Sequence, residues 1–220
     1  MGTTQAWLRY CLPFWPGLPH VGKMWDADCA IVLAFGRNHY HDGNLHLVRA
    51  IRDLKGDDRQ AIGHFRAMGF DPGDSNRGLA RAMELICWDL GCGLIPQWEV
   101  AVAFDESYRL WGDRVRTLWP PDRGYYDTDR VLCDALSVMK REGWKTPLLI
   151  AHDWQMPRAF LQLKKLLGRP PIVMPVTDSN GDKITSRFDL HSVQLWTRHP
   201  LLWLAREIPG RVALLAKGYV

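Results

Sequence analysis

The segment from Ala151 to Ala159, which follows an apolar run, gathers several side chains that could do chemistry. His152 could move a proton near neutral pH, because an imidazole titrates close to neutrality. Asp153 adds a carboxylate, although a residue adjacent in sequence need not orient that imidazole. We name His152 and Asp153 as the candidate catalytic residues.

Three further side chains of this segment are candidate ligand-binding residues: Trp154, Gln155 and Arg158. The indole of Trp154 could stack on a base or a sugar. Arg158 falls in the first turn of an expected helix, where its guanidinium and the free backbone N–H groups could bind an anion together. A structural alternative stays open, in which Arg158 pairs with an acidic residue such as Asp127 and braces two loops.

A second candidate segment, Gly36-Arg37-Asn38, follows the apolar run that begins at Ala30. A glycine after a strand lets a ligand approach the backbone, and Arg37 could make a bidentate contact to phosphate or carboxylate. Neither GxGxxG nor GxxxxGK[ST] occurs here, so a plain turn with a solvated Arg37 is the alternative. We name Gly36, Arg37 and Asn38 as candidate ligand-binding residues.

The following loop contains histidines that could bind a metal ion. His39 and His41, with Asp42 and His46, could converge on one ion if the loop folds back. No second cluster of ligands is recognisable elsewhere in the sequence, so we favour no metal and leave the cofactor unknown. The sequence also has no GxSxG motif that would mark a nucleophilic serine.

Strands and helices alternate along the chain. Unbroken apolar runs predict buried strands at 30–36, 147–151 and 172–176, and an alternating pattern predicts another at 114–118. The stretch 96–110 is ambiguous and favours a helix. Further helices are expected at 45–54, 57–68, from Ser75 or Asn76 to 90, from Asp127 or Thr128 to 143, 156–167 and 191–216, the last broken near Pro209-Gly210.

This alternation predicts an α/β fold, a Rossmann-like three-layer sandwich with a mostly parallel central sheet and helices on both faces. In such sheets, ligands bind beyond the carboxyl ends of the strands. The loops 36–43, 119–128 and 151–158 should therefore meet at one edge. Asp127 and Thr128, which open a helix at this edge, join the candidate ligand-binding residues.

Composition is that of an ordinary globular protein. The chain has 220 residues, 47% of them hydrophobic, enough for one sizeable core. Its net charge of +4 suits a small anionic ligand. Basic residues near Arg114 are interrupted by acidic ones such as Asp113, so nucleic-acid binding is the least favoured function.

The five cysteines form no CxxC pair, which favours reduced thiols in the cytoplasm. The apolar stretch 6–15 is interrupted by Arg9 and Pro13 and is too short to span a bilayer. We therefore expect a soluble cytoplasmic protein with no membrane partner, an N-terminal arm at 1–27 and one domain at 28–220. The oligomeric state is left open.

The segment 151–167 resembles the YdcF/SanA/ElyC-like family, a domain of unknown function, through Met156-Pro157-Arg158-Ala159. Ala30 to Gly36 is similar to the family's opening strand and glycine turn, and Asp127-Thr128 to its Asn-Thr helix start. The resemblance spans roughly residues 28–218, including a C-terminal part with Trp196, Arg198, Arg206 and Glu207, and is poor over 55–120.

The resemblance implies a Rossmann-like fold with a polar pocket, and binding of a nucleotide or of S-adenosylmethionine. This chain departs from the family at several positions. Gln155 stands where the family has His, His152 where a small hydroxyl residue is usual, Arg37 where a second Gly is usual, and Asp127 where Asn is usual.

Two functions remain open. The first is an enzyme of hydrolase or group-transfer type that acts on an anionic or nucleotide-like small molecule. The second is a non-catalytic domain that senses such a ligand or takes part in an interaction. A deep pocket would favour the first, and a shallow site with an exposed Trp154 the second.

Overall fold

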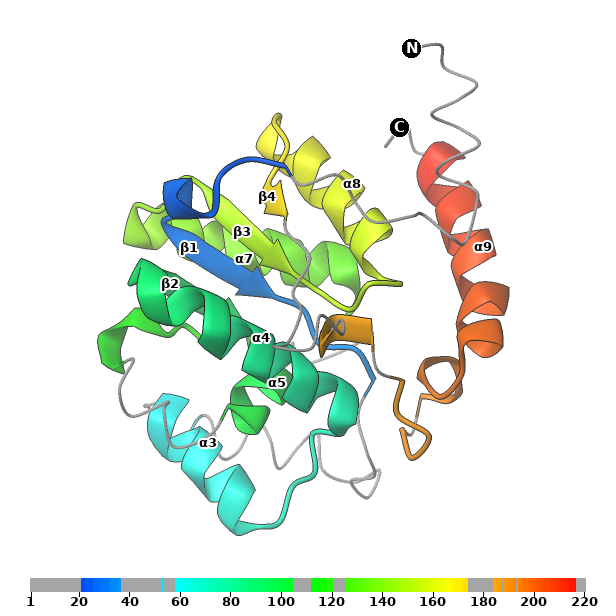
Figure 1. Ribbon diagram of the computed structural model, residues 1–220, viewed down its shortest axis with the longest axis horizontal. Helices are drawn as coiled ribbons and strands as arrows, with labels where there is room; N and C mark the ends of the chain where they lie inside the picture. The colour runs from blue at the N-terminus through cyan, green and yellow to red at the C-terminus, as the bar shows by residue number, and fades with distance from the viewer. Residues whose placement is uncertain are drawn as a thin grey trace.

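The structure, a computed structural model, describes residues 21–36, 53, 58–104, 112–120, 126–173, 184–186, 188–192 and 194–216. Four strands form one parallel sheet in the order β2-β1-β3-β4 (Figure 1). They are β1 (Cys29–Val32), β2 (Gly93–Pro96), β3 (Pro147–Ile150) and β4 (Ile172–Val173). The predicted α/β class with a parallel central sheet is confirmed.

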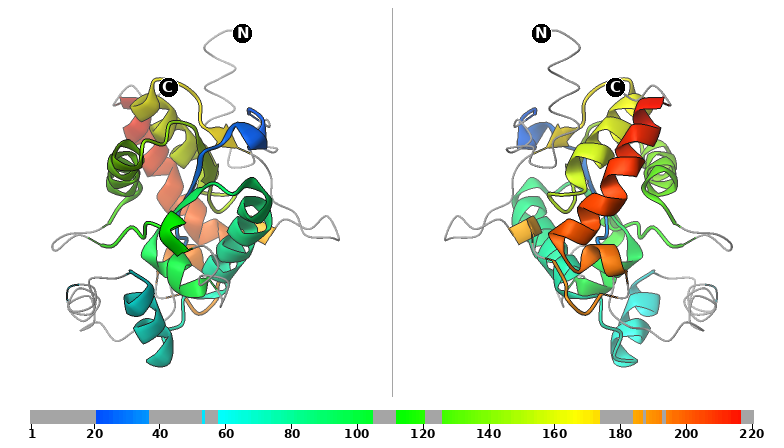
Figure 2. Two further views of the ribbon diagram at one scale, coloured as in Figure 1. Left: turned by 90° about the vertical axis from the view of Figure 1, so that its left-hand side faces the viewer. Right: turned by 90° about the vertical axis from the view of Figure 1, so that its right-hand side faces the viewer.

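Alternate side chains of β1 enter two separate cores. Ala30 and Val32 pack in the core with α3 (Asp58–Ala67), α4 (Asp74–Leu90) and α5 (Trp98–Ala103). Cys29 and Ile31 pack in the core with α7 (Thr128–Glu142) and α8 (Met156–Leu167). Figure 2 shows α4 and α7 on opposite sides of the sheet. Because both faces are covered, the strands are apolar throughout, as buried parallel strands usually are.

Several predicted helix ends are confirmed. The carboxylate of Asp127 accepts a hydrogen bond from the backbone N–H of Arg130, and so caps α7. The same helix ends at Gly143, whose φ of +77° is a left-handed conformation that favours glycine. Helix α8 ends at Gly168. The cap at Asp127 fixes the start of α7, whose first turn lies at the carboxyl edge of the sheet.

Other boundaries were predicted wrongly. Strand β2 was not predicted, because its four residues end in a proline; β2 lies at the sheet edge, where a terminal proline is tolerated. Residues 114–118 form only two isolated bridges, from Val115 to Leu94 and from Leu118 to Gln97. The N-cap of α4 is Gly73 rather than Ser75 or Asn76, since the side chain of Asn76 bonds the segment after β1 instead.

The C-terminal helix α9 (Pro200–Ala216) starts later than predicted and continues through Pro209. Strand β1 ends at Val32, and residues 33–36 leave the sheet. Of the predicted helix 45–54, only Asp53 belongs to the described residues. Residues 174–176, the end of the third predicted strand, lie outside them.

The end of the proposed N-terminal arm contacts the sheet. Val21 and Val173 of β4 exchange two backbone hydrogen bonds of 3.1 Å. A short 3-10 helix, η1 (Met24–Asp26), leads from there to β1. Within the described part of the chain, no helix combines the length and the apolar character that crossing a bilayer requires.

Candidate functional site

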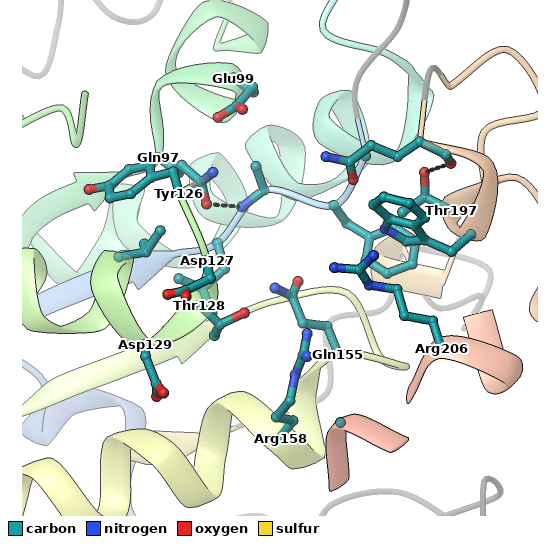
Figure 3. A pocket seen from close by; sticks show the side chains of 18 of the residues that line it. Gln97, Glu99, Tyr126, Asp127, Thr128, Asp129, Gln155, Arg158, Thr197 and Arg206 are labelled. Carbon is teal, nitrogen blue, oxygen red and sulfur yellow. Dashed lines mark hydrogen bonds between the residues drawn. The ribbon is translucent and has the colours of Figure 1, made fainter. Parts of the chain in front are cut away.

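A cavity of about 280 Å³ opens at the carboxyl edge of the sheet (Figure 3). Its walls are the segments that follow β1, β2 and β3, the first turns of α7 and α8, the short helix η4 (Leu195–Thr197), and α9. The chain passes from β2 over β1 to β3, so the strand order reverses beside β1. Ligands of open parallel sheets bind at such a switch point.

The structure brings half of the predicted site residues to this cavity. Its lining includes Gly36, Asp127, Thr128, Gln155 and Arg158. Arg37 and Asn38 lie outside the described residues. Trp154 and the two candidate catalytic residues do not line the cavity.

His152 lies behind the cavity wall. Its side chain is fully buried, and its ring stacks on that of Phe35, with the centroids 3.6 Å apart. Its Nδ1 atom accepts a hydrogen bond of 3.3 Å from the backbone N–H of Trp154. Because Phe35 lines the cavity, His152 supports the wall without facing the ligand space.

Asp153 and Trp154 connect the loop after β3 to later parts of the chain. A carboxylate oxygen of Asp153 accepts a hydrogen bond of 2.6 Å from the hydroxyl of Thr185. The carbonyl of Trp154 accepts a bond of 3.3 Å from the indole N–H of Trp203 on α9. The ring of Trp154 also packs edge-on against Phe188. In these positions both residues hold the cavity walls together.

Gly36 and Asn76 shape the wall that follows β1. Gly36 has φ of +73°, and a Cβ atom there would lie 2.6 Å from the hydroxyl oxygen of Thr197. Glycine is therefore required for the close approach of this wall to η4. The side chain of Asn76 accepts a hydrogen bond from the N–H of Phe35 and donates one to the carbonyl of Gly36, both at 2.9 Å.

One end of the cavity is cationic. Arg158 approaches the carboxylate of Glu207 on α9, with Nη1 3.6 Å from Oε2, and Arg211 bonds its other oxygen at 3.2 Å. Glu207 is 2% exposed. Burial raises the pKa of Glu207, and the two guanidiniums only partly offset this effect. Two arginines share one carboxylate, so this network has a net positive charge.

The sequence left open that Arg158 pairs with an acidic residue such as Asp127. In the structure, the acidic partner of Arg158 is Glu207. Asp127 instead caps α7. The guanidinium of Arg158 also lies 5.7 Å from the centre of the Trp203 ring. Arg206 also lines the cavity, and its guanidinium stacks at 3.8 Å over the ring of Trp196.

The opposite end is acidic. Glu99, Asp127 and Asp129 line it, and Glu99 is buried in the first turn of α5. Burial raises the pKa of Tyr126, and the charges of Asp134 and Glu99 raise it further. Glu99 therefore acts electrostatically on this end of the cavity.

Helix α8 and its N-cap present a polar face to the cavity at Gln155, Arg158 and Gln162. Within the described part of the chain, Nε of Arg158 and the Oε1 atoms of Gln155 and Gln162 are buried without a hydrogen-bond partner. Gln155 is 7% exposed and Gln162 4%. Buried polar atoms are rarely left unsatisfied, because each such atom destabilises the fold by about 1–3 kcal/mol. All three residues line the cavity.

Sequence reasoning missed much of this lining. Glu99 escaped notice because β2, which positions it, was not predicted. A signal for α8 was available, since positions 155, 158 and 162 share one helical face. Nothing local to the sequence indicates that Glu207 reaches Arg158.

The candidate metal ligands His39, His41, Asp42 and His46 lie outside the described residues. Among the residues that are described, no three His, Cys, Asp or Glu side chains are grouped so that they could hold a metal ion.

Comparison of the chain with protein-family models, with curated proteins and with solved structures found no match.

Proposed function

We propose that this protein binds a small anionic molecule in the cavity at the carboxyl edge of its sheet, with Arg158 as the main anion contact. The observation that carries the proposal is that Arg158 lines a ligand-sized cavity and that its buried Nε has no acceptor among the described residues. A guanidinium binds phosphate or carboxylate through several N–H groups. An oxyanion would supply the missing acceptor.

The surroundings of Arg158 favour an anion as well. The network of Arg158, Glu207 and Arg211 has a net positive charge. Helices α7 and α8 point their N-termini, the positive ends of the helix dipoles, toward the cavity.

The cavity volume limits the size of the ligand. At about 280 Å³, the cavity is just below the roughly 300 Å³ at which pockets for drug-sized molecules begin. A mononucleotide or a smaller metabolite is the expected class, not a dinucleotide.

Catalysis of hydrolase or group-transfer type is part of this proposal. The groups supporting it are the carboxylates of Glu99 and Asp129, which line the same cavity as the guanidinium of Arg158 and belong to a residue type that commonly serves as a general acid or base. His152 and Asp153 do not line the cavity and would need the loop after β3 to move. A non-catalytic sensing domain would use the same anion contact.

Membership of the YdcF/SanA/ElyC-like family and binding of S-adenosylmethionine remain predictions, supported by the resemblance of the sequence alone. A cytoplasmic location is likewise a prediction. The free thiols of Cys29, Cys87, Cys92 and Cys133 agree with it.

A thermal-shift experiment tests the anion contact. Inorganic phosphate, glycerol 3-phosphate, AMP and S-adenosylmethionine are each added to the wild type and to Arg158→Met, which keeps an unbranched side chain but removes the guanidinium. A ligand at a hundredfold its Kd should stabilise the wild type by about 2.7 kcal/mol. We expect this shift to disappear in Arg158→Met.

Arg81→Met is the matched control, because Arg81 is exposed on α4 and does not line the cavity. Its ligand shift should equal that of the wild type, and potassium chloride at equal ionic strength should cause none. A shift of full size in Arg158→Met would show that the anion binds elsewhere.

A further inference from the structure

We infer that the ligand carries an ammonium group in addition to its oxyanion, so that its two ends match the two ends of the cavity. This inference rests on the proposed anion site at Arg158 and deepens it. The juxtaposition that carries it is Gln162, one helical turn from Arg158 on α8, with the carboxylate of Asp129 to which its amide is hydrogen-bonded.

The charges of the lining do not suit a simple anion. The described lining residues include two guanidiniums, Arg158 and Arg206, and three carboxylates, Glu99, Asp127 and Asp129. The lining is therefore formally one unit negative. A ligand with only negative charge would be attracted at one end and repelled at the other. A ligand with both charges is complementary to the whole cavity.

The two kinds of charge are separated in space. The guanidiniums come from α8 and α9, and the carboxylates from α5, α7 and its N-cap. Figure 3 shows Asp127 and Asp129 on the side of the cavity opposite Arg206, with Arg158 between them. A ligand whose oxyanion binds Arg158 would have room to place its other end near the carboxylates.

The orientation of the side-chain amide of Gln162 indicates which group the rest of the ligand should contain. Nε2 of Gln162 donates a hydrogen bond of 2.6 Å to the carboxylate of Asp129, which can only accept. Oε1 of Gln162 is therefore an acceptor, and it is buried without a donor among the described residues. Gln162 follows Arg158 by about one turn, or about 6 Å along α8. A ligand with a donor at this position would supply the missing partner of Oε1.

An ammonium group fits this position better than a hydroxyl group does. It offers three donors, enough for Oε1 of Gln162 and the carboxylate of Asp129. It also brings a positive charge to the carboxylate of Asp129, and a carboxylate that lines a cavity is stabilised by an opposite charge nearby. A hydroxyl would supply one donor and no charge.

A metal ion is a poorer match for the same carboxylates. In the described part of the chain they are not grouped closely enough, with each other or with His or Cys, to coordinate one ion. An ammonium group needs only one carboxylate and one neutral acceptor, and Asp129 with Gln162 provides both.

The test compares three phosphate esters of similar size by isothermal titration calorimetry: phosphoethanolamine, ethyl phosphate and glycerol 3-phosphate. The first carries an ammonium group, the second no donor, and the third hydroxyl groups. Because a charge-assisted hydrogen bond is worth a factor of about ten to a hundred in affinity, phosphoethanolamine should bind that much more tightly than ethyl phosphate. It should also bind more tightly than glycerol 3-phosphate.

A double variant, Glu99→Gln with Asp129→Asn, locates the preference. It should bind phosphoethanolamine and ethyl phosphate with Kd values within about threefold of each other. The control Asp74→Asn, an exposed carboxylate on α4 that does not line the cavity, should keep the wild-type ratio. If the double variant folds and keeps the wild-type ratio, the inference is overturned.

The wild-type titrations test the inference even if the double variant does not fold. Equal Kd values for phosphoethanolamine and ethyl phosphate, or tightest binding of glycerol 3-phosphate, would overturn the ammonium inference and leave the anion site standing. Absence of binding for all three esters would overturn the anion site, and the inference with it.

Discussion

Replacing Asn76 with alanine is expected to lower the free energy of unfolding by about 3–6 kcal/mol. Asn76 is fully buried, and its amide makes three hydrogen bonds. It accepts one from the N–H of Phe35 and donates to the carbonyls of Gly36 and Pro72. Alanine would leave these three backbone groups without the amide, and each buried unsatisfied group destabilises the fold by about 1–3 kcal/mol.

Urea denaturation measures this loss. The control Arg77→Ala changes the next residue of α4, whose side chain is half exposed and paired with Asp71 and Asp74 on the surface. Surface pairs contribute about 0–1 kcal/mol, so this variant should stay close to the wild type. A loss below about 1 kcal/mol for Asn76→Ala would contradict the assigned role of Asn76.

Replacing Glu207 with alanine is expected to destabilise the protein by about 3–5 kcal/mol. Glu207 is buried between Arg158 and Arg211, and Arg211 is itself 5% exposed. Removal of the carboxylate leaves the buried charge of Arg211 without this partner. The raised pKa of Glu207 agrees with a large desolvation penalty, but removing one member of a buried pair is still strongly destabilising.

Thermal and urea unfolding of Glu207→Ala measure this loss in the free energy of unfolding. Arg81→Ala is the control, because it breaks an exposed pair with Glu84 at 3.5 Å, for which a change of at most about 1 kcal/mol is expected. If the two variants unfold at the same urea concentration, the ion pairs of Glu207 with Arg158 and Arg211 do not stabilise the fold as described.

Local signals were enough to predict the core of the fold. The buried runs of β1 and β3, the cap at Asp127 and the end of α7 at Gly143 all follow from short-range rules, and the structure has them. Parallel pairing then places the carboxyl ends of the strands at one edge. For this reason the location of the cavity, and five of its lining residues, could be predicted.

Contacts between distant segments could not be predicted in the same way. His152 has the chemistry of a catalytic residue, but stacking on Phe35 buries it behind the wall. Glu207 reaches Arg158 only because α9 packs beside α8. Such positions depend on tertiary packing, which no periodicity of the sequence encodes.

A crystal structure of the protein grown with saturating phosphoethanolamine tests the central claim most directly. We predict density for the phosphate group within hydrogen-bond distance of Nε of Arg158, with the rest of the molecule toward Gln162 and Asp129. A cavity that contains only water, or a phosphate group bound solely at another surface, would contradict the claim that this edge of the sheet is an anion-binding site.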